Sequence, residues 1–122
     1  PRIIGILDWE LSTLGDPLAD LAYQLMAWQF PREGGIAGLA GLDRAELGLP
    51  SDEDYIAAYC QRTGRSGIDN WPFYMAFCFF RIAAILQGIK KRAQIGTASS
   101  AEADSRAIMV GPLAALGAAC IP

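Results

Sequence analysis

The sequence predicts a mainly α-helical fold that is led by one β-strand. Two observations support this prediction. Residues 2–8 form an apolar run that ends in a carboxylate, as in a strand, and after residue 16 apolar residues recur at helical spacing. Hydrophobic residues make up 52% of the 122 residues, which is enough for one buried core but not for two separate domains. We therefore expect residues 1–122 to form a single, partial domain.

The predicted strand runs from Arg2 to Asp8. Its continuous apolar character indicates burial on both faces, which would fix the backbone and present Asp8 rigidly at the end of the strand. The apolar residues are Ile3, Ile4, Ile6 and Leu7. A lone strand is not stable in water, so its partner is expected outside these residues. Because the chain also begins at Pro1, inside the predicted strand, we interpret it as a fragment.

A first helix is predicted to begin at Asp16-Pro17 and to stop at Pro31. Asp16 is a preferred N-cap residue, and Pro17 fits the first helical position because no backbone donor is lost there. Residues 32–50 are rich in glycine but lack the strand–Gly-x-Gly-x-x-Gly–helix context of a nucleotide-binding loop. We expect them to form an irregular loop and not a phosphate site.

Two further helices are predicted after this loop. Ser51 as N-cap and acidic residues in the first turn begin one helix, and Gly64 ends it. Trp71-Pro72 opens the longest helix, which should run to about Ile95 and form the centre of the domain. Because it contains Arg81, a buried core helix is favoured over a membrane span, which needs about 20 mostly apolar residues.

The last predicted helix runs from about Ser100 to Leu116. Glu102 and Asp104 lie in its first turn, where acidic side chains interact favourably with the helix dipole. Gly111-Pro112 is expected to kink or divide the helix, because proline lacks a backbone donor. The residues predicted to face inward are Ala107, Ile108, either Met109 or Val110, Leu113 and Leu116.

Charge and cysteine content argue against several classes of partner. The net charge of −3 disfavours a nucleic-acid-binding surface, which would require clustered lysine and arginine. The chain has three cysteines without a Cys-x-x-Cys pair and no histidine, so neither a disulfide framework nor a Cys/His zinc site is predicted. A reducing, cytoplasmic location is therefore expected, with no nucleic-acid or membrane partner.

Asp8 and Glu10 form a candidate metal site. A rigid carboxylate beside a second acid suits a hard divalent cation, and Mg²⁺ binds one or two carboxylates and completes its coordination with water and phosphate oxygens. At positions i and i+2 of an extended backbone, the two side chains would lie on one face.

The residues around this candidate site resemble a known family. Ile6-Leu7-Asp8-Trp9-Glu10, then Gly15-Asp16-Pro17 and Asp20-Leu21-Ala22, are similar to the metal-binding segment of aminoglycoside-phosphotransferase-like kinases. The similarity is greatest to the branch found fused to, or encoded beside, acyl-CoA dehydrogenases, and it continues to Gly88. The resemblance implies the C-terminal helical lobe of a protein-kinase-like (α+β) phosphotransferase, with the N-terminal lobe and the catalytic loop absent.

The resemblance also implies site residues and cofactors. Asp8 matches the family's second metal-binding aspartate, with Glu10 as a direct or water-mediated contact, and ATP and Mg²⁺ are the implied phosphoryl donor and metal. Asp20 matches an aspartate that braces the catalytic loop by accepting backbone hydrogen bonds. The family's catalytic His-Gly-Asp segment is missing, and the first lysine is Lys90, so the chain alone should not catalyse transfer.

The implied acceptor is a hydroxyl group of a small molecule, and the acyl-CoA dehydrogenase association points to a hydroxyacyl compound and to such a dehydrogenase as a partner. Trp71, Tyr74 and Arg81 are the candidate residues of the acceptor pocket. Two interpretations of Arg81 remain open. The first is a structural ion pair between Arg81 and a buried acid, because an unpaired buried charge is very costly. The second is a contact between Arg81 and an anionic group of the substrate.

Two other functions also remain open. A metal-dependent nuclease or hydrolase could use Asp8 and Glu10, but it would need a nearby lysine or histidine and a basic groove, which this acidic chain does not offer. The other alternative is a non-catalytic helical scaffold, a degenerate kinase lobe. The intact Asp8, Glu10 and Asp20 argue against such decay.

Overall fold

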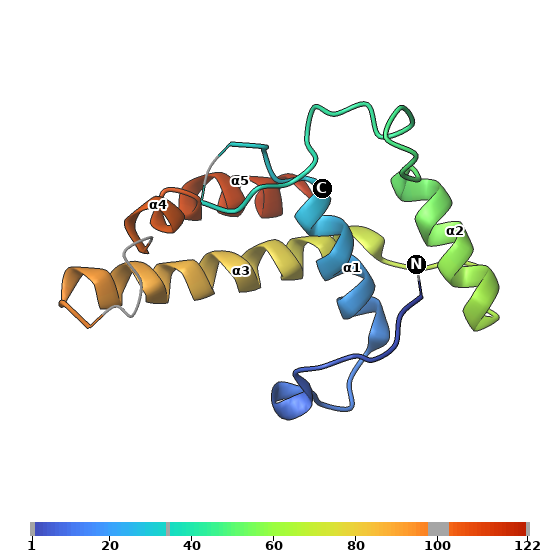
Figure 1. Ribbon diagram of the computed structural model, residues 1–122, viewed down its shortest axis with the longest axis horizontal. Coiled ribbons are helices and arrows are strands. Elements are labelled where there is room, and N and C mark those ends of the chain that lie inside the picture. The colour runs from blue at the N-terminus through green and yellow to red at the C-terminus, as the bar shows by residue number, and fades with distance from the viewer. Residues whose placement is uncertain (1, 34, 98–102, 122) are drawn as a thin grey trace.

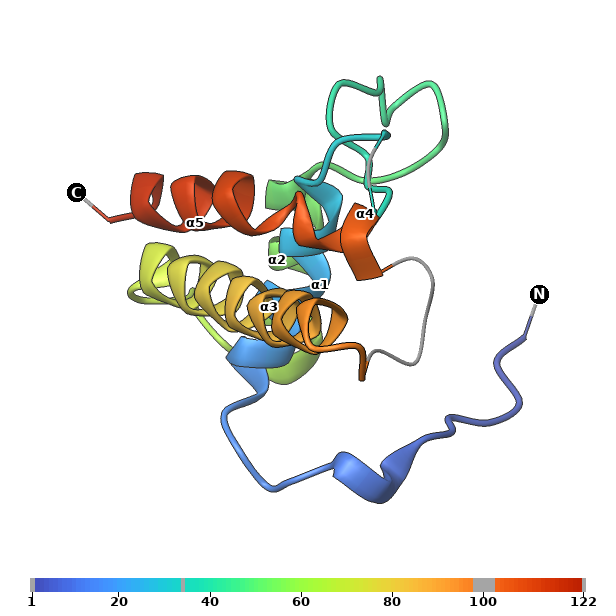
Figure 2. The same ribbon diagram turned by 90° about the vertical axis from the view of Figure 1, so that its left-hand side faces the viewer.

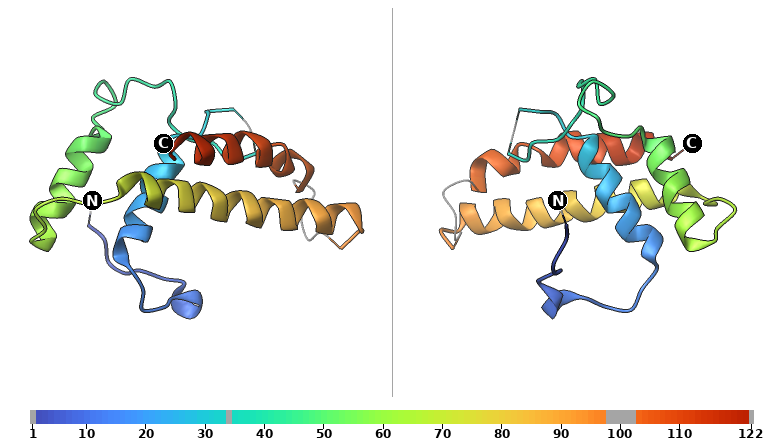
Figure 3. Two further views of the ribbon diagram at one scale, coloured as in Figure 1. Left: turned by 180° about the vertical axis from the view of Figure 1, so that it is seen from behind. Right: turned by 45° about the vertical axis from the view of Figure 1, so that its right-hand side comes forward.

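The computed structural model describes residues 2–33, 35–97 and 103–121, and in these ranges all regular structure is helical (Figure 1). The elements are the 3-10 helix η1 (Trp9–Leu11), α1 (Pro17–Trp28), α2 (Asp52–Thr63), α3 (Trp71–Gln94), α4 (Ala103–Ala107) and α5 (Val110–Ala119). Helix α3 spans the molecule, α4 and α5 return along it, and α1 crosses it (Figures 1 and 3). The prediction of a mainly α-helical fold is confirmed.

Helix α1 begins with the predicted cap. The Asp16 carboxylate accepts a hydrogen bond from the Leu18 N–H at 3.0 Å, and Pro17 occupies the first helical position. The helix ends at Trp28, before Pro31. Its buried residues are Leu18, Leu21, Ala22, Leu25 and Met26. This apolar face packs against α3.

Helix α3 is the central helix, as predicted, because α1, α4 and α5 all pack on it. By length and composition alone it could span a membrane. One of its faces is instead buried in the protein, where it joins α1 and α5 in one hydrophobic core. The buried residues of α3 are Met75, Ala76, Cys78, Phe79, Ile82, Ala83 and Leu86. Burying each of the larger side chains contributes about 1.5–3 kcal/mol, so this face holds the three helices together.

Helices α4 and α5 replace the single last helix (Figure 2). The break falls at Ile108 and Met109, one turn before Pro112, whose ring would clash with the carbonyl group four residues earlier. The predicted division is confirmed. Ile108 was expected to face inward but is 76% exposed, because the break turns it out of the helical pattern. Ser100 and Glu102 lie outside the described residues.

Helix α5 lies close to α3 because of a glycine. A Cβ atom at Gly117 would lie 3.1 Å from the Cβ of Phe79 on α3. Leu113 of the same helix is fully buried, whereas Leu116, which was predicted to face inward, is 37% exposed. The inward face of α5 therefore carries Leu113 and Gly117, one turn apart.

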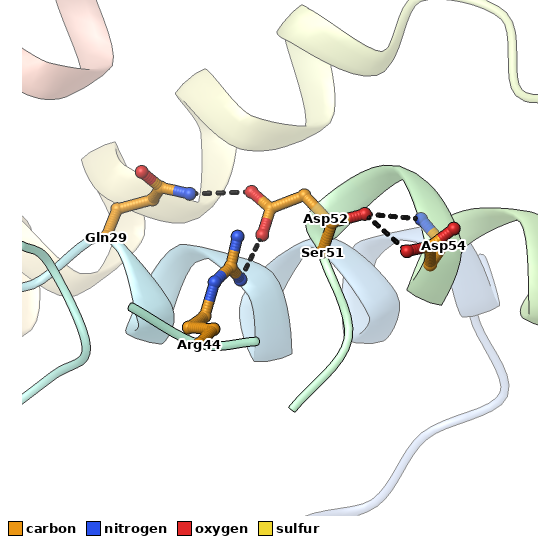
Figure 4. A network of polar contacts seen from close by, with 5 residues as sticks. All are labelled: Gln29, Arg44, Ser51, Asp52 and Asp54. Atoms are coloured by element: carbon orange, nitrogen blue, oxygen red, sulfur yellow. Dashed lines mark hydrogen bonds and ion pairs between the residues drawn. The ribbon is translucent and has the colours of Figure 1, made fainter. Parts of the chain in front are cut away.

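Helix α2 has the predicted caps and is tied to α1 by polar contacts (Figure 4). Ser51 Oγ accepts a hydrogen bond from the Asp54 N–H at 3.0 Å, and Gly64 ends the helix in the left-handed conformation at φ 69°. Asp52 then forms an ion pair with Arg44 and accepts a hydrogen bond from Gln29 Nε2 at 2.7 Å. One carboxylate thus connects the end of α1, the loop and α2.

The loop between α1 and α2 is irregular, as predicted, but part of it is closely packed. Gly38 N–H donates to the Pro31 carbonyl at 2.9 Å, and the Ala40 N–H donates to the Phe30 carbonyl at 3.0 Å. A Cβ atom at Gly38 would lie 2.4 Å from the Phe30 carbonyl oxygen. Glycine is therefore required at position 38 so that the loop can lie against the end of α1.

The predicted strand at residues 2–8 is not found, and this expectation was wrong for the described residues. The segment has no regular structure and extends away from the helices (Figure 2). Its apolar side chains are exposed, at 83% for Ile3, 96% for Ile4, 68% for Ile6 and 87% for Leu7. A strand needs a hydrogen-bonding neighbour, and the described part of the chain provides none. An apolar run indicates a segment that favours burial, but it does not supply the partner.

Candidate functional site

A cavity of about 420 Å³ lies where the segment after η1 meets the start of α1 and the middle of α3. Its lining residues are Trp9, Ser12, Thr13, Leu14, Gly15, Asp16, Pro17, Ala19, Asp20 and Arg81. The charged groups of the lining are therefore two carboxylates and one guanidinium, beside two hydroxyl groups. Such a mixture of acceptors, donors and apolar surface can bind a polar group, and we take it as the candidate site.

The segment that carries the candidate metal ligands is held by local hydrogen bonds. Trp9 Nε1 donates to the Ile6 carbonyl at 2.8 Å, and Ser12 Oγ donates to the Trp9 carbonyl at 2.7 Å. These bonds close the turn around η1. The buried strand expected to support Asp8 is not found among the described residues, so the expected rigidity of Asp8 does not come from burial.

Asp8 and Glu10 are both exposed, and their backbone is not extended. Asp8 adopts the left-handed conformation at φ 69° and ψ 44° immediately before η1, and Glu10 lies within η1. An extended backbone therefore does not place the two side chains on one face, and this expectation was wrong. The described residues contain no group of three or more acidic, cysteine or histidine side chains that could hold a metal ion. Two carboxylates do match what Mg²⁺ takes from a protein when water and phosphate supply its remaining ligands.

Asp16 does more than cap α1. Tyr74 Oη on α3 donates a hydrogen bond to Asp16 Oδ2 at 2.7 Å, and the other carboxylate oxygen accepts the Leu18 N–H. The Tyr74 hydrogen bond, followed by the Leu18 bond, lowers the pKa of Asp16 below its ordinary value of 3.8. The same bond to the Asp16 carboxylate raises the pKa of Tyr74 above 10.0. Tyr74, predicted for the acceptor pocket, thus reaches the cavity through Asp16.

Asp20 and Arg81 line the cavity from α1 and α3. The Asp20 carboxylate is exposed and makes no hydrogen bond or ion pair with the described residues. Arg81 is also exposed, and its guanidinium carbon lies 5.4 Å from the centre of the Tyr23 ring, within the range of a cation–π contact. The ion pair that we considered between Arg81 and a buried acid is absent from the described residues, so that interpretation is wrong for them.

Cys78 of α3 contacts α1 from the core. The residue is 1% exposed, and its Sγ donates to the Ala19 carbonyl at 3.5 Å. Burial raises the pKa of the Cys78 thiol, and the Arg81 charge lowers and the Asp20 charge raises that pKa by smaller amounts. The thiol therefore belongs to the core and is not one of the polar groups of the cavity lining.

Trp71, the third residue predicted for the acceptor pocket, packs against the hydrophobic core and does not line the cavity. Conversely, sequence reasoning did not select Ser12, Thr13 or Tyr23. For Ser12 and Thr13, the signal in the sequence was a pair of adjacent hydroxyl side chains close to Asp8. Nothing in the sequence pattern pointed to Tyr23, because its role depends on how α1 crosses α3.

Comparisons with known proteins give matches in sequence and in structure. The sequence pattern of the phosphotransferase enzyme family (APH) matches residues 1–75, which include Asp8, Glu10, Asp16, Asp20 and Tyr74. A crystal structure of a protein from Ralstonia eutropha, provisionally named an aminoglycoside phosphotransferase, is 49% identical and superposes with a TM-score of 0.89 over 98% of this chain. The chain covers 36% of that structure.

Two longer proteins are also similar. Acyl-CoA dehydrogenase family member 10 of mouse is 49% identical over 116 residues, which are 94% of this chain and 11% of that protein. Acyl-CoA dehydrogenase family member 11 of human is 39% identical over 117 residues, 95% of this chain and 15% of that protein. The chain thus spans a small part of the curated relatives that it matches.

Proposed function

The chain belongs to the phosphotransferase enzyme family, and from this premise we propose that the full-length protein transfers a phosphoryl group from ATP, with Mg²⁺, to a hydroxyl group of a small molecule. The observation that carries the proposal is the position of Asp8 and Glu10. They lie in the matched segment, next to the residues that line a cavity with two further carboxylates, two hydroxyl groups and one guanidinium. We expect the reaction to take place in the cytoplasm.

In this proposal, Asp8 and Glu10 bind the metal. A bound Mg²⁺ would neutralise charge on the nucleotide phosphates, and phosphoryl transfer depends mainly on such positioning and electrostatic stabilisation. The two carboxylates provide the oxygen ligands that this ion prefers. The left-handed backbone at Asp8 supports a functional role, because strained conformations of residues other than glycine tend to be kept at functional sites.

The remaining groups of the reaction are assigned to the rest of the protein. A cationic contact to the phosphates and a carboxylate that orients the acceptor hydroxyl are both needed. The chain has no histidine, and the chain covers 36% of the solved relative. We propose that the N-terminal lobe and a catalytic segment lie in the part of the protein that these residues do not include, and that Asp20 braces that segment.

For the acceptor, we propose a hydroxyacyl compound. The support is the naming of the similar proteins as acyl-CoA dehydrogenase family members, which also makes an acyl-CoA dehydrogenase the proposed partner. Arg81 lines the cavity from α3, and Asp16, which accepts the hydrogen bond from Tyr74 of α3, lines it at the start of α1. Trp71 packs against the core and does not line the cavity, so any effect on the acceptor would be indirect.

The test uses the full-length protein and its Asp8→Asn variant. Asparagine tolerates the left-handed backbone and keeps the shape of the side chain, so the variant should fold while losing the charged ligand. We expect the rate of ATP- and Mg²⁺-dependent phosphorylation of hydroxyacyl substrates to fall more than about 100-fold, because even residues that only orient metal ligands contribute roughly 10–100-fold. Glu46→Gln, an exposed loop substitution, is the matched control.

Two results would overturn the proposal. One is that the unmodified full-length protein shows no Mg²⁺-dependent transfer from ATP to any hydroxylated acceptor. The other is that Asp8→Asn retains the activity and the Mg²⁺ dependence of the Glu46→Gln control.

A further inference from the structure

Asp20 and Arg81 share a cavity, carry opposite charges and yet remain apart. Both line the cavity, and neither forms an ion pair with the other or with any other described residue. Opposite charges that line one cavity without pairing can both contact a third partner that enters it.

The chemistry of the two side chains restricts this partner. An ionised carboxylate only accepts hydrogen bonds, and a guanidinium only donates them. A free anion at Arg81 would also meet the carboxylates of Asp16 and Asp20 in the same cavity, and a free cation would meet Arg81. A peptide main chain is neutral and offers both an N–H donor and a carbonyl acceptor. It therefore fits both residues at once.

Arg81 is held in place for such a contact. Its guanidinium carbon lies 5.4 Å from the centre of the Tyr23 ring, which favours a fixed orientation of the planar group. Asp16, the other carboxylate of the cavity, is already engaged by Tyr74 and by the Leu18 N–H. Among the charged groups of the cavity lining, Asp20 and Arg81 are thus the two that form no hydrogen bond or ion pair with a described residue.

We propose that Asp20 and Arg81 together hold one main-chain turn of the part of the protein beyond these 122 residues, Asp20 by accepting its N–H groups and Arg81 by donating to its carbonyl groups. The chain covers 36% of the solved relative, so a longer protein has a main chain to supply. The inference rests on the proposed function, in which Asp20 braces the catalytic segment. It adds Arg81 as a second positioning residue, with Tyr23 as its support.

The first experiment is amide hydrogen exchange on the full-length protein. Arg81→Met should raise exchange about 10-fold or more in one short segment outside residues 1–122, because a charge-assisted hydrogen bond to that segment is lost. Exchange in α1 and α3 should stay unchanged, since Arg81 is exposed. Arg62→Met, an exposed arginine of α2, is the matched control. Unchanged exchange outside residues 1–122 would overturn the inference.

Steady-state kinetics provide the second readout. Mispositioning of a reacting group by about 1 Å can lower the rate by about 10²-fold, so kcat of Arg81→Met should fall on that order while KM for ATP and for the acceptor stays within about twofold. Arg81→Lys should recover part of the loss, because it keeps a cationic donor but not the planar fork. Combining Asp20→Asn with Arg81→Met should lower kcat by less than the product of the two single effects.

The two readouts separate the possible outcomes. A higher KM for the acceptor with unchanged kcat and unchanged exchange would make Arg81 a substrate anion contact and overturn the inference. Increased exchange in a protein that shows no phosphotransferase activity would support the main-chain contact and contradict the proposed function instead.

Discussion

Tyr74 Oη on α3 donates a hydrogen bond to Asp16 Oδ2, the N-cap carboxylate of α1, at 2.7 Å. The same carboxylate accepts the Leu18 N–H, so one side chain both begins α1 and ties it to α3. Because α1 carries Asp20 and α3 carries Arg81, this bond helps to set the geometry of the cavity between them. The capping residue is thus also a tertiary contact.

Tyr74→Phe should lower the melting temperature of the protein at neutral pH, and the effect should disappear at both pH extremes. The folded state lowers the pKa of Asp16 below 3.8, so this contribution is present above that pH and is lost as the pH falls through the folded pKa. The folded state raises the pKa of Tyr74 above 10.0, so its contribution is lost as the pH rises through that higher value. Melting curves of both proteins across pH measure the difference. A difference in melting temperature between the two proteins that does not change with pH would contradict this prediction.

Gly38→Ala should destabilise the protein by about 1–3 kcal/mol, as expected for overpacking. The new Cβ atom would lie 2.4 Å from the Phe30 carbonyl oxygen and 2.6 Å from the Ala27 carbonyl oxygen, and these backbone atoms cannot move without disturbing the end of α1. Gly67→Ala is the control, because nothing lies within 4 Å of its Cβ position. Chemical denaturation of both variants measures the free energy of unfolding. Equal stabilities would show that the loop does not pack on α1.

Leu113→Ala should cost about 2–5 kcal/mol in the free energy of unfolding, since Leu113 is fully buried between α5 and the core. Leu116→Ala in the same helix makes the same chemical change at a side chain that is 37% exposed, so its cost should be clearly smaller. Comparing the two by denaturant unfolding isolates the effect of burial. If both variants lose the same stability, α5 does not pack on α3 through its Leu113 face.

Arg44 and Asp52 should show a coupling free energy of about 0.2–1 kcal/mol in a double-mutant cycle, because the pair is partly exposed at 23% and 26%. Arg44→Met and Asp52→Asn, alone and combined, form the cycle. Raising the salt concentration should reduce the coupling, since exposed charges are screened. A coupling that salt does not change would contradict an exposed ion pair. The Arg44 contact over the Trp28 ring at 5.1 Å contributes to the single Arg44→Met effect and cancels in the cycle.

Local sequence signals predicted the helices well. Asp16 and Ser51 each accept the backbone hydrogen bond expected of an N-cap, and Gly64 has the left-handed backbone of a helix end. Pro112 marks the division between α4 and α5. These features depend on interactions within a few residues, which a sequence pattern contains in full.

The prediction of a strand at residues 2–8 was wrong because a strand depends on a partner that is distant in sequence. An apolar run such as residues 2–8 indicates a tendency to be buried, but a strand exists only where another strand satisfies its backbone groups. The same limit applies to the candidate site. Asp8, Glu10 and Asp20 could be selected from their spacing and from the family resemblance, whereas the position of Arg81 over Tyr23 could not.

By itself, the sequence determined where α1, α2 and α3 begin and that each carries an apolar face, because capping and periodicity are local properties of the chain. The resemblance to the phosphotransferase family indicated which carboxylates belong to its metal-binding segment. Only the tertiary structure decided that Asp16 accepts a hydrogen bond from Tyr74, that Asp20 and Arg81 line one cavity, and that α5 approaches α3 at Gly117. The physical reason is that these relationships depend on how α1 and α5 pack on α3. That packing is fixed by the combined fit of many side chains distant in sequence.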